Sequence, residues 1–326
     1  MTVAEAPLRV RVDPTNPGQF FACCGLLELA DRAWGGAEGW FEGNTHSFYL
    51  QSMNTAQCSI AEMIDRVQRI GLRGALSAEL KRERDALETK RRELKKEKQV
   101  LSQAGEKRRK ELGTLLRAGS IAIAEPFGLR LDWWGDESDD VPKTWAGSQE
   151  VLRIALAALV SCREAFATES PFEYYCVMRS HAGGSPAEDP GETLDAEGND
   201  DNHEVADGDK VEPFYFDAVR GAHAHPLDVG FSPNKHKHLT LTAAPAIEFL
   251  CLVGLQRHRP KPTNEARVFE YYTWASPVTT CIAPAAVSGL LPHVGSRIFR
   301  FENAFRTDQR KHKGFTQAAS FARREQ

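Results

Sequence analysis

The sequence predicts an α+β fold, with mixed sheets packed against helices and a charged helical hairpin that protrudes from them. Three observations lead to this class. Segments in which apolar and polar residues alternate, as in strands, are interspersed with segments of helical spacing. A stretch in the first half of the chain is almost entirely Lys, Arg and Glu around regularly spaced leucines. No internal repeat of roughly 20–50 residues is present, so a solenoid or a propeller is not expected.

Residues 1–75 are expected to form an N-terminal α+β part. Residues 8–12 alternate apolar and charged side chains, which predicts a half-buried strand. Asn16 and Pro17 supply an N-cap and a first-turn proline, so a helix is expected from there to about Trp34. Its apolar residues are too many for a thin amphipathic stripe, which predicts burial on most sides. The other elements expected in this part are a strand or hairpin at 40–50 and a helix at 59–71.

Residues 76–118 are expected to form a charged helical arm. Its leucines recur every seven residues between charged positions, so the apolar seam is too narrow for a long parallel coiled coil. Gly105 is expected to interrupt the helix, which indicates two helices folded back as an antiparallel hairpin. The 13 basic and 8 acidic residues between 79 and 111 suit a solvated structural arm, a nucleic-acid contact or a dimerising zipper. The spaced leucines are Leu80, Leu87, Leu94 and Leu101.

The central part of the chain continues the body and then becomes acidic. Residues 119–180 are expected to continue the α+β core, with strands at 129–133 and 172–178 and a helix at 145–166. Residues 181–210 are rich in Gly, Pro, Asp and Glu, which predicts a disordered surface loop. This loop holds ten carboxylates. Without them the chain has 41 basic and 35 acidic residues, so the overall net charge of −4 hides a mildly basic body.

Residues 211–326 are expected to form a C-terminal α+β part that ends in a basic tail. A helix is expected at 244–257. The tail from Gly295 has phenylalanines among its cations, which suits base stacking and equally suits an edge strand. The strands expected in this part lie at 214–216, 239–242, 268–274 and 298–301.

The composition narrows the class of protein. The chain has no run of about 18 apolar residues and no apolar leader, so neither a membrane span nor a signal peptide is expected. Seven cysteines at scattered, mostly apolar positions indicate reduced thiols in a cytoplasmic protein. Phosphate-binding, dinucleotide-binding, nucleophile-elbow and zinc-ligand motifs are missing, so no cofactor and no structural metal are expected.

A cluster of polar residues between 217 and 238 is the candidate for chemistry. Histidines two apart on a strand share one face, and with Asp they suit a divalent metal for phosphodiester cleavage. Lys235 and Lys237 lie between the histidines, which suits a loop that contacts phosphates, another subunit or only solvent. The cluster consists of Asp217, His223, His225, Asp228, Asn234, His236 and His238.

Three basic groups are candidates for nucleic-acid contacts. The first lies in the polar cluster, where Asn and Lys side chains are able to contact base edges. The second follows the helix at 244–257, where cations also complement the helix dipole. The third belongs to the basic tail. The candidate residues are Asn234, Lys235, Lys237, Arg257, Arg259, Lys261, Arg297 and Arg300.

Two blocks of the sequence resemble a known family. The first is DPTNPGQFFACCGLLELADRAW followed by GGAEGWF. The second is LTLTAAPAIEFLCLVGLQRHRPKP followed by VFEYYTWASPV and IAPAAVSGLLP. Together they are similar to the short large-subunit-type protein of type I-U, also called I-G, CRISPR–Cas systems. The resemblance covers roughly the first 50 residues and residues 227–295, and it includes no catalytic signature.

The resemblance implies a non-catalytic subunit of an RNA-guided surveillance (Cascade) complex in antiviral defence. Its expected partners are the other effector subunits, the guide RNA and target double-stranded DNA, with no membrane. It would read the protospacer-adjacent motif and help open the duplex before a separate helicase-nuclease cleaves. No motif-reading residue carries over from the family. Two other functions stay open: a metal-dependent nuclease built on the 217–238 cluster, and a structural adaptor that docks partners through the charged arm.

Overall fold

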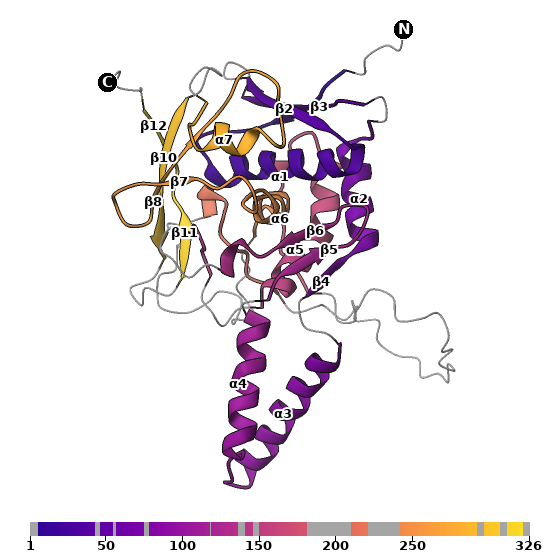
Figure 1. Ribbon diagram of the computed structural model, residues 1–326, viewed down its shortest axis with the longest axis vertical. Coiled ribbons are helices and arrows are strands. Elements are labelled where there is room, and N and C mark those ends of the chain that lie inside the picture. Colours follow the sequence, from indigo (N-terminus) through magenta and orange to yellow (C-terminus); the bar gives the residue numbers. More distant parts are fainter. Residues whose placement is uncertain are drawn as a thin grey trace, which may run out of the picture.

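The computed structural model describes residues 6–42, 46–54, 57–74, 78–117, 119–135, 141–145, 150–180, 210–220, 242–291, 297–306 and 312–321. These residues form an α+β body from which a helical hairpin projects, so the predicted class is confirmed (Figure 1). A single hydrophobic cluster joins buried residues from Val10 to Ala318. The parts of the body that the sequence separates by the arm and the acidic segment therefore share one core.

Three strands from the first part of the chain and one short strand from its last part form a four-stranded antiparallel sheet, which one helix covers. Its elements are β1 (Leu8–Arg11), α1 (Pro17–Trp34), β2 (Ala37–Glu42), β3 (Ser47–Ser52) and β9 (Val278–Thr279). The strand order is β1-β3-β2-β9, and β3 runs antiparallel to both β1 and β2, which is a split βαβ arrangement. On the inner face, Phe41 stacks on Phe20 of α1 with ring centroids 5.0 Å apart. The alternate side chains of the strands face away from this core.

Helix α1 packs against α6 (Pro245–Gly254) at the centre of the body (Figure 1). The start of α1 is the predicted one, because the Asn16 side chain accepts a hydrogen bond from the backbone N–H of Gly18 at 3.1 Å. All ten residues of α6 are buried, as expected for a helix that is apolar on every side. The two backbones touch at Gly25 and Gly254, where a Cβ would meet a carbonyl oxygen of the other helix.

Two amphipathic helices and a small sheet flank this central pair. They are α2 (Ile60–Ile70), α5 (Val151–Ala165), β4 (Leu72–Gly74), β5 (Ile121–Ile123) and β6 (Leu129–Leu131). The predicted helix at 59–71 is confirmed, and a capping box between Ser59 and Glu62 fixes its first residue. The predicted helix at 145–166 is observed as α5, which packs against both α6 and α2.

The last part of the chain forms a five-stranded antiparallel sheet on the other side of α1. Its strands are β7 (Lys261–Pro262), β8 (Val268–Tyr272), β10 (Ile298–Phe305), β11 (Lys313–Phe315) and β12 (Ala319–Phe321), and the short helix α7 (Ala283–Val287) contacts β8. Tyr271 and Phe301 project inward and contact the ring of Phe21 on α1. The two sheets therefore enclose α1.

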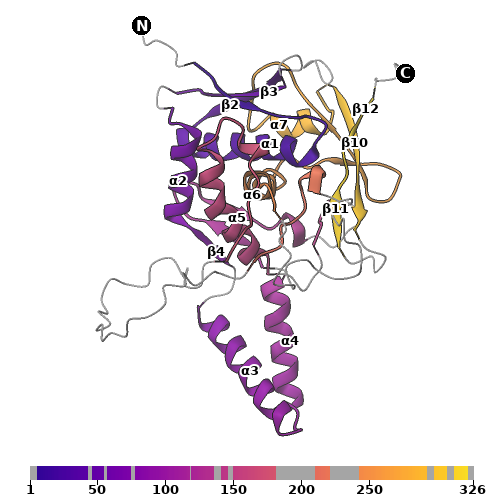
Figure 2. The same ribbon diagram turned by 180° about the vertical axis from the view of Figure 1, so that it is seen from behind.

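The predicted charged hairpin is confirmed as α3 (Ala78–Lys96) and α4 (Gln103–Arg117). Both views show it projecting from the body (Figures 1 and 2). The turn between the helices lies at 97–102 and includes Lys98 with a left-handed φ of 61°. The expected break at Gly105 is wrong. Gly105 lies in the first turn of α4, where its N–H donates to the Ser102 hydroxyl at 3.2 Å, so the helix begins there.

Two predicted strands are wrong. The segment 172–178 forms a 3₁₀ turn, η2 (Pro171–Glu173), followed by an isolated bridge between Cys176 and Ala243. The segment 214–216 belongs to no strand ladder, although all three of its side chains are buried. Aromatic residues favour a strand only where a partner strand is available to pair with. The first segment pairs with another segment at one isolated bridge, and the second pairs at none. Within the part of the chain that is described, none of the helices has the length and apolar content needed to cross a bilayer.

Candidate nucleic-acid interface

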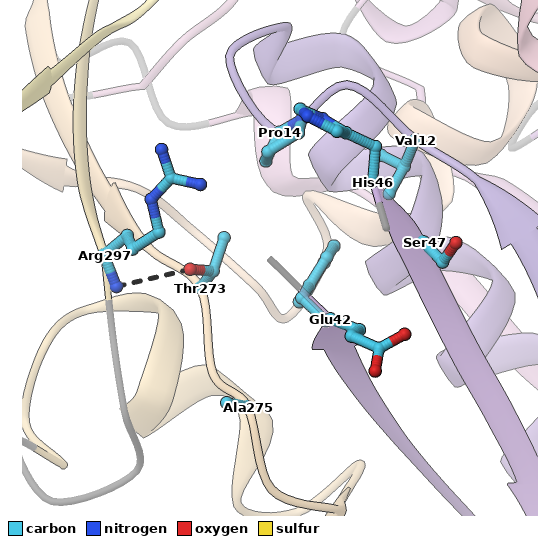
Figure 3. Close-up of a pocket in the computed structure, with 9 residues that line it drawn as sticks. Val12, Pro14, Glu42, His46, Ser47, Thr273, Ala275 and Arg297 are labelled. Carbon is cyan, nitrogen blue, oxygen red and sulfur yellow. Dashed lines mark hydrogen bonds between the residues drawn. The ribbon is translucent and has the colours of Figure 1, made fainter. Parts of the chain in front are cut away.

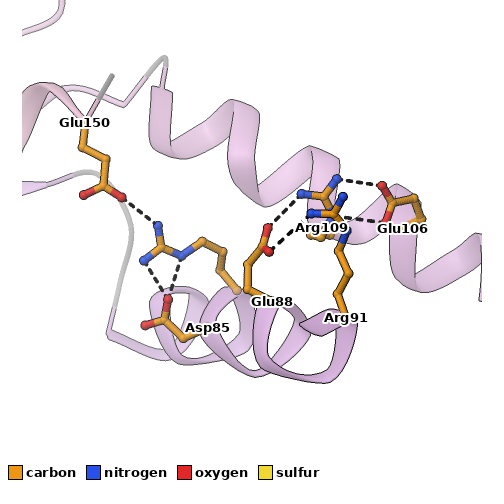
Figure 4. A network of polar contacts seen from close by, with 7 residues as sticks. Asp85, Glu88, Arg91, Glu106, Arg109 and Glu150 are labelled. Carbon is orange, nitrogen blue, oxygen red and sulfur yellow. Dashed lines mark hydrogen bonds and ion pairs between the residues drawn. The ribbon is translucent and has the colours of Figure 1, made fainter. Parts of the chain in front are cut away.

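The facing sides of the two arm helices are held together by arginine–carboxylate pairs (Figure 4). Arg108 donates to both carboxylate oxygens of Glu83 at 2.8 and 2.9 Å. Arg109 donates to Glu88 on the opposite helix at 2.8 Å and to Glu106 on its own helix at 2.6 Å. These hydrogen bonds lower the pKa of Glu83 and of Glu106. The seam between α3 and α4 is therefore built from mutually compensating arginines and glutamates.

One arginine also attaches the arm to the body. Arg84 on α3 donates to Asp85 at 2.8 Å and to Glu150 at 3.2 Å (Figure 4). Glu150 is the N-cap residue of α5, which packs on the central helix α6. This ion pair links the base of the arm to the core of the body.

Most of the cations outside these pairs lie toward the tip of the arm, although Arg82 near its base is also exposed and has no ion pair among the described residues. The stretch 90–107 contains seven basic and three acidic residues. Six of its seven cations are exposed and form no ion pair among the described residues, whereas Arg91 pairs with Glu88 at 3.7 Å. We call these six residues the arm-tip cations: Lys90, Arg92, Lys95, Lys96, Lys98 and Lys107. A protruding hairpin with cations at its end suits contact with a phosphate backbone.

The second predicted basic group, at the end of α6, is divided by the structure. Arg257 donates to buried Glu28 at 3.3 Å, and Glu28 also accepts from Arg32 at 2.7 Å. Arg257 therefore neutralises a charge within the fold. His258 is buried as well, and burial lowers its pKa to about 4, so its ring is neutral near pH 7. Arg259 and Lys261 are exposed.

The third predicted basic group is also divided. Arg297 is exposed and lines a pocket with Pro14, His46 and Thr273, where its backbone N–H donates to the Thr273 hydroxyl at 3.3 Å (Figure 3). Arg300 lies on the outer face of β10. It donates to Glu270 on β8 at 2.6 Å, so its charge is compensated across the sheet. In the groups at the end of α6 and in the basic tail, three of the predicted residues form no ion pair among the described residues: Arg259, Lys261 and Arg297.

The polar cluster at 217–238 falls mostly outside the described residues, including Asn234, Lys235 and Lys237 and all four of its histidines. Its described member, Asp217, is fully buried and accepts from Asn16 at 2.7 Å and from the Tyr175 hydroxyl at 2.8 Å. Asp217 thus helps to hold α1 in the body. Over the described ranges, no three His, Cys, Asp or Glu residues meet in a group that could hold a metal ion.

A second buried carboxylic acid adjoins Asp217, and it is not among the residues predicted from the sequence. Glu248, in the first turn of α6, is fully buried, and its Oε2 atom has no hydrogen-bond partner in the described part of the chain. Burial and the charge of Asp217 raise the pKa of Glu248 to about 8. A lone glutamate inside an otherwise apolar helix was the signal available in the sequence.

Comparison of the chain with family models, with curated proteins and with solved structures finds no match in any of the three.

Proposed function

We propose that this chain is a non-catalytic, cytoplasmic subunit of an RNA-guided CRISPR effector complex that binds target double-stranded DNA. In this proposal it works with the other effector subunits and the guide RNA. It reads the protospacer-adjacent motif to license duplex opening, with Asn234, Lys235 and Lys237 as the proposed base-contacting residues. The resemblance of its two sequence blocks supports the family. Those blocks include α1 and α6, which pack together at the centre of the fold.

The observation that carries DNA binding is the separation of charge on the arm. The seam carboxylates Glu83, Glu88 and Glu106 are each bound by an arginine, while the arm-tip cations are exposed and unpaired among the described residues. An arm built only as a solvated support has no need to place its excess positive charge at the end farthest from the body. Cations that contact phosphates release counterions, which makes affinity depend steeply on salt.

Neutralising four arm-tip cations (Lys90→Gln, Arg92→Gln, Lys95→Gln and Lys96→Gln) is expected to weaken duplex DNA binding. The slope of log affinity against log salt should shrink by about 0.9 for each phosphate that the variant no longer neutralises. Gel-shift or anisotropy titrations over a range of salt concentrations measure both quantities. The matched control is Glu93→Gln with Glu97→Gln on the same stretch of the arm, which removes exposed negative charge and should leave affinity equal or higher. Equal affinity and slope in the two variants would contradict the proposal.

The same titration, run with and without magnesium and with and without the other subunits plus guide RNA, separates the alternatives. Binding without cleavage, strengthened by the complex and dependent on a flanking motif, supports the recognition subunit. Magnesium-dependent degradation by the chain alone would establish the nuclease instead.

The adaptor alternative has one observation in its favour. Val100, in the turn at the tip of the arm, is 88% exposed, and an apolar side chain at that position suits a protein contact. This alternative predicts no DNA affinity for the isolated chain and a failure of complex assembly when residues 76–116 are removed.

A further inference from the structure

The outer face of the N-terminal sheet carries a row of three side chains that none of the predicted sites includes. Arg9 on β1 lies opposite Tyr49 on β3, and Tyr49 lies opposite Trp40 on β2. Neighbouring strands are about 4.8 Å apart, so a guanidinium, a phenol and an indole stand side by side across three strands. We call these three residues the outer row.

The two rings of the outer row form a parallel stack. The Trp40 and Tyr49 centroids are 5.4 Å apart and the ring planes differ by 11°. Both residues are partly exposed. Side chains alternate between the two faces of a strand, and the neighbouring residues Phe41, Phe48 and Leu50 point into the core and are buried. Rings stacked on each other leave further ring surface on which another planar group can continue the stack.

The indole of Trp40 is the one tryptophan ring of the chain that is not buried, since all six tryptophans are described and the other five are buried. Trp133 and Trp274 donate their indole N–H groups to backbone carbonyl oxygens of the core. The Trp40 N–H has no partner among the described residues. A half-exposed indole with an unused donor is able both to stack on a ligand and to hydrogen-bond it.

The charged residues at the two ends of the outer row indicate what kind of ligand this face would bind. Arg9 donates its Nε–H to the Ser47 hydroxyl at 2.8 Å, which orients the guanidinium and leaves its two terminal nitrogens without an acceptor among the described residues. Arg11 is exposed on the same face and forms an ion pair with Glu173 at 3.8 Å, so Arg9 is the cation of β1 that has no ion pair among the described residues. On β2, Glu38 and Glu42 face the same side, and Glu42 accepts from the Tyr49 hydroxyl at 3.0 Å. The face is thus cationic along β1, aromatic in the middle and anionic along β2.

We propose that the outer row binds an unpaired nucleotide of a single-stranded nucleic acid. Its base stacks on the Tyr49–Trp40 pair, and its phosphate meets Arg9 on the β1 side, away from the carboxylates of β2. A base inside a duplex has no free face, so this surface selects single strands. The inference rests on the proposed function and deepens it by adding a second nucleic-acid contact of a different kind. Both views place β2 and β3 at the end of the body opposite the arm (Figures 1 and 2).

The test uses the full-length chain with oligouridylate, oligothymidylate and a duplex of mixed sequence as probes. Because the other five tryptophans are buried, saturable quenching of tryptophan fluorescence by the single-stranded probes is expected to report on Trp40. Tyr49→Leu is expected to lower single-strand affinity about ten-fold, whereas Tyr49→Phe, which keeps the ring, is expected to preserve it. Arg9→Gln should weaken binding and Glu38→Gln should not.

Photocross-linking of the unmodified chain to bromouridine-substituted probes removes any dependence on the folding of a variant. Cross-links at Trp40 or Tyr49 are expected for both RNA and DNA single strands, and a preference for one of them tells guide RNA from displaced DNA. Absence of quenching and of cross-links at these rings overturns the inference, even if arm-dependent duplex binding is intact. If single strands quench the fluorescence but the arm-tip variants bind duplex DNA as tightly as the wild type does, the proposed function is overturned. The contact at the outer row then stands by itself.

Discussion

Replacing Gly254 by alanine is expected to prevent the chain from folding stably. Gly254 lies at the end of α6, and a Cβ there would collide with the carbonyl oxygen of Phe21 and the backbone nitrogen of Gly25. Neither atom belongs to a flexible side chain, so α1 and α6 would have to separate and open the core between them. We expect a loss of about 4 kcal/mol or more, which is comparable to the whole stability of many domains.

The sign of this effect opposes helix propensity. Alanine is intrinsically better than glycine inside a helix by about 1 kcal/mol, so only the close approach of the two backbones makes the change harmful. Gly135→Ala is the matched control, because apart from its chain neighbours no heavy atom of the described residues lies within 4 Å of a Cβ built at Gly135, and its φ is not left-handed. Soluble yield, circular dichroism and thermal melting measure both variants. A Gly254→Ala protein that melts with the wild type would show that the helices do not touch there.

Glu248→Gln is expected to make the protein more stable at pH 8 and to flatten its dependence on pH. Burial, reinforced by the negative charge of Asp217, raises the pKa of Glu248 from 4.5 to about 8 in the folded chain. Glutamine has the same shape, and its carbonyl oxygen can accept the hydrogen bonds that the carboxylate accepts from the backbone of Phe214, Phe216 and Asp217. It carries no charge, and its NH2 group takes the place of the Oε2 atom, which has no hydrogen-bond partner among the described residues.

The direction follows from the raised pKa. The folded state holds its proton more tightly than the unfolded state, so this group contributes its full stability below pH 4.5 and loses it as pH rises toward 8. Each unit of raised pKa corresponds to about 1.4 kcal/mol, so the variant should exceed the wild type by about 4 kcal/mol at pH 8, where the folded-state carboxyl is half ionised. The difference should vanish at about pH 4. The other groups that interact with Glu248 are Tyr215 and Cys251, whose own pKa values are raised by burial.

Glu28→Gln is the matched control for this prediction. Glu28 is also fully buried, but its carboxylate is bound by Arg32 and Arg257. Removing its charge leaves two arginines without their acceptor, so this variant should be less stable than the wild type at neutral pH. Urea unfolding at several pH values compares the three proteins. A Glu248→Gln protein that is less stable than the wild type at pH 8 would contradict the assignment of a raised pKa.

Much of the local structure was predictable because its signals are local. Asn16 followed by Pro17 defines the start of α1, and the capping box at Ser59 defines the start of α2, each within one turn of backbone. The arm follows from charged residues around spaced leucines, which favour exposed helices. The position of its turn was wrong, because helix-starting hydrogen bonds to Ser102 outweigh the low helix propensity of Gly105.

The candidate site was predictable only in part. The excess of positive charge on the arm is visible in the sequence, but which of its arginines are paired with glutamates depends on how two helices face each other. Arg257 is the clearest case. As a residue near a helix end it suits a phosphate contact, and in the fold it compensates Glu28, which lies 229 positions earlier in the chain.

By itself the sequence determined the class of the fold, the long helices, the hairpin and the basic character of the arm, since caps, periodicity and composition act between near neighbours. Only the tertiary structure decided that Gly25 meets Gly254, that Asp217 is buried against Asn16, and that Arg9, Tyr49 and Trp40 form one row. Each of these contacts joins segments that are separate along the chain. Their meeting depends on the register and packing of whole elements, which no local pattern encodes.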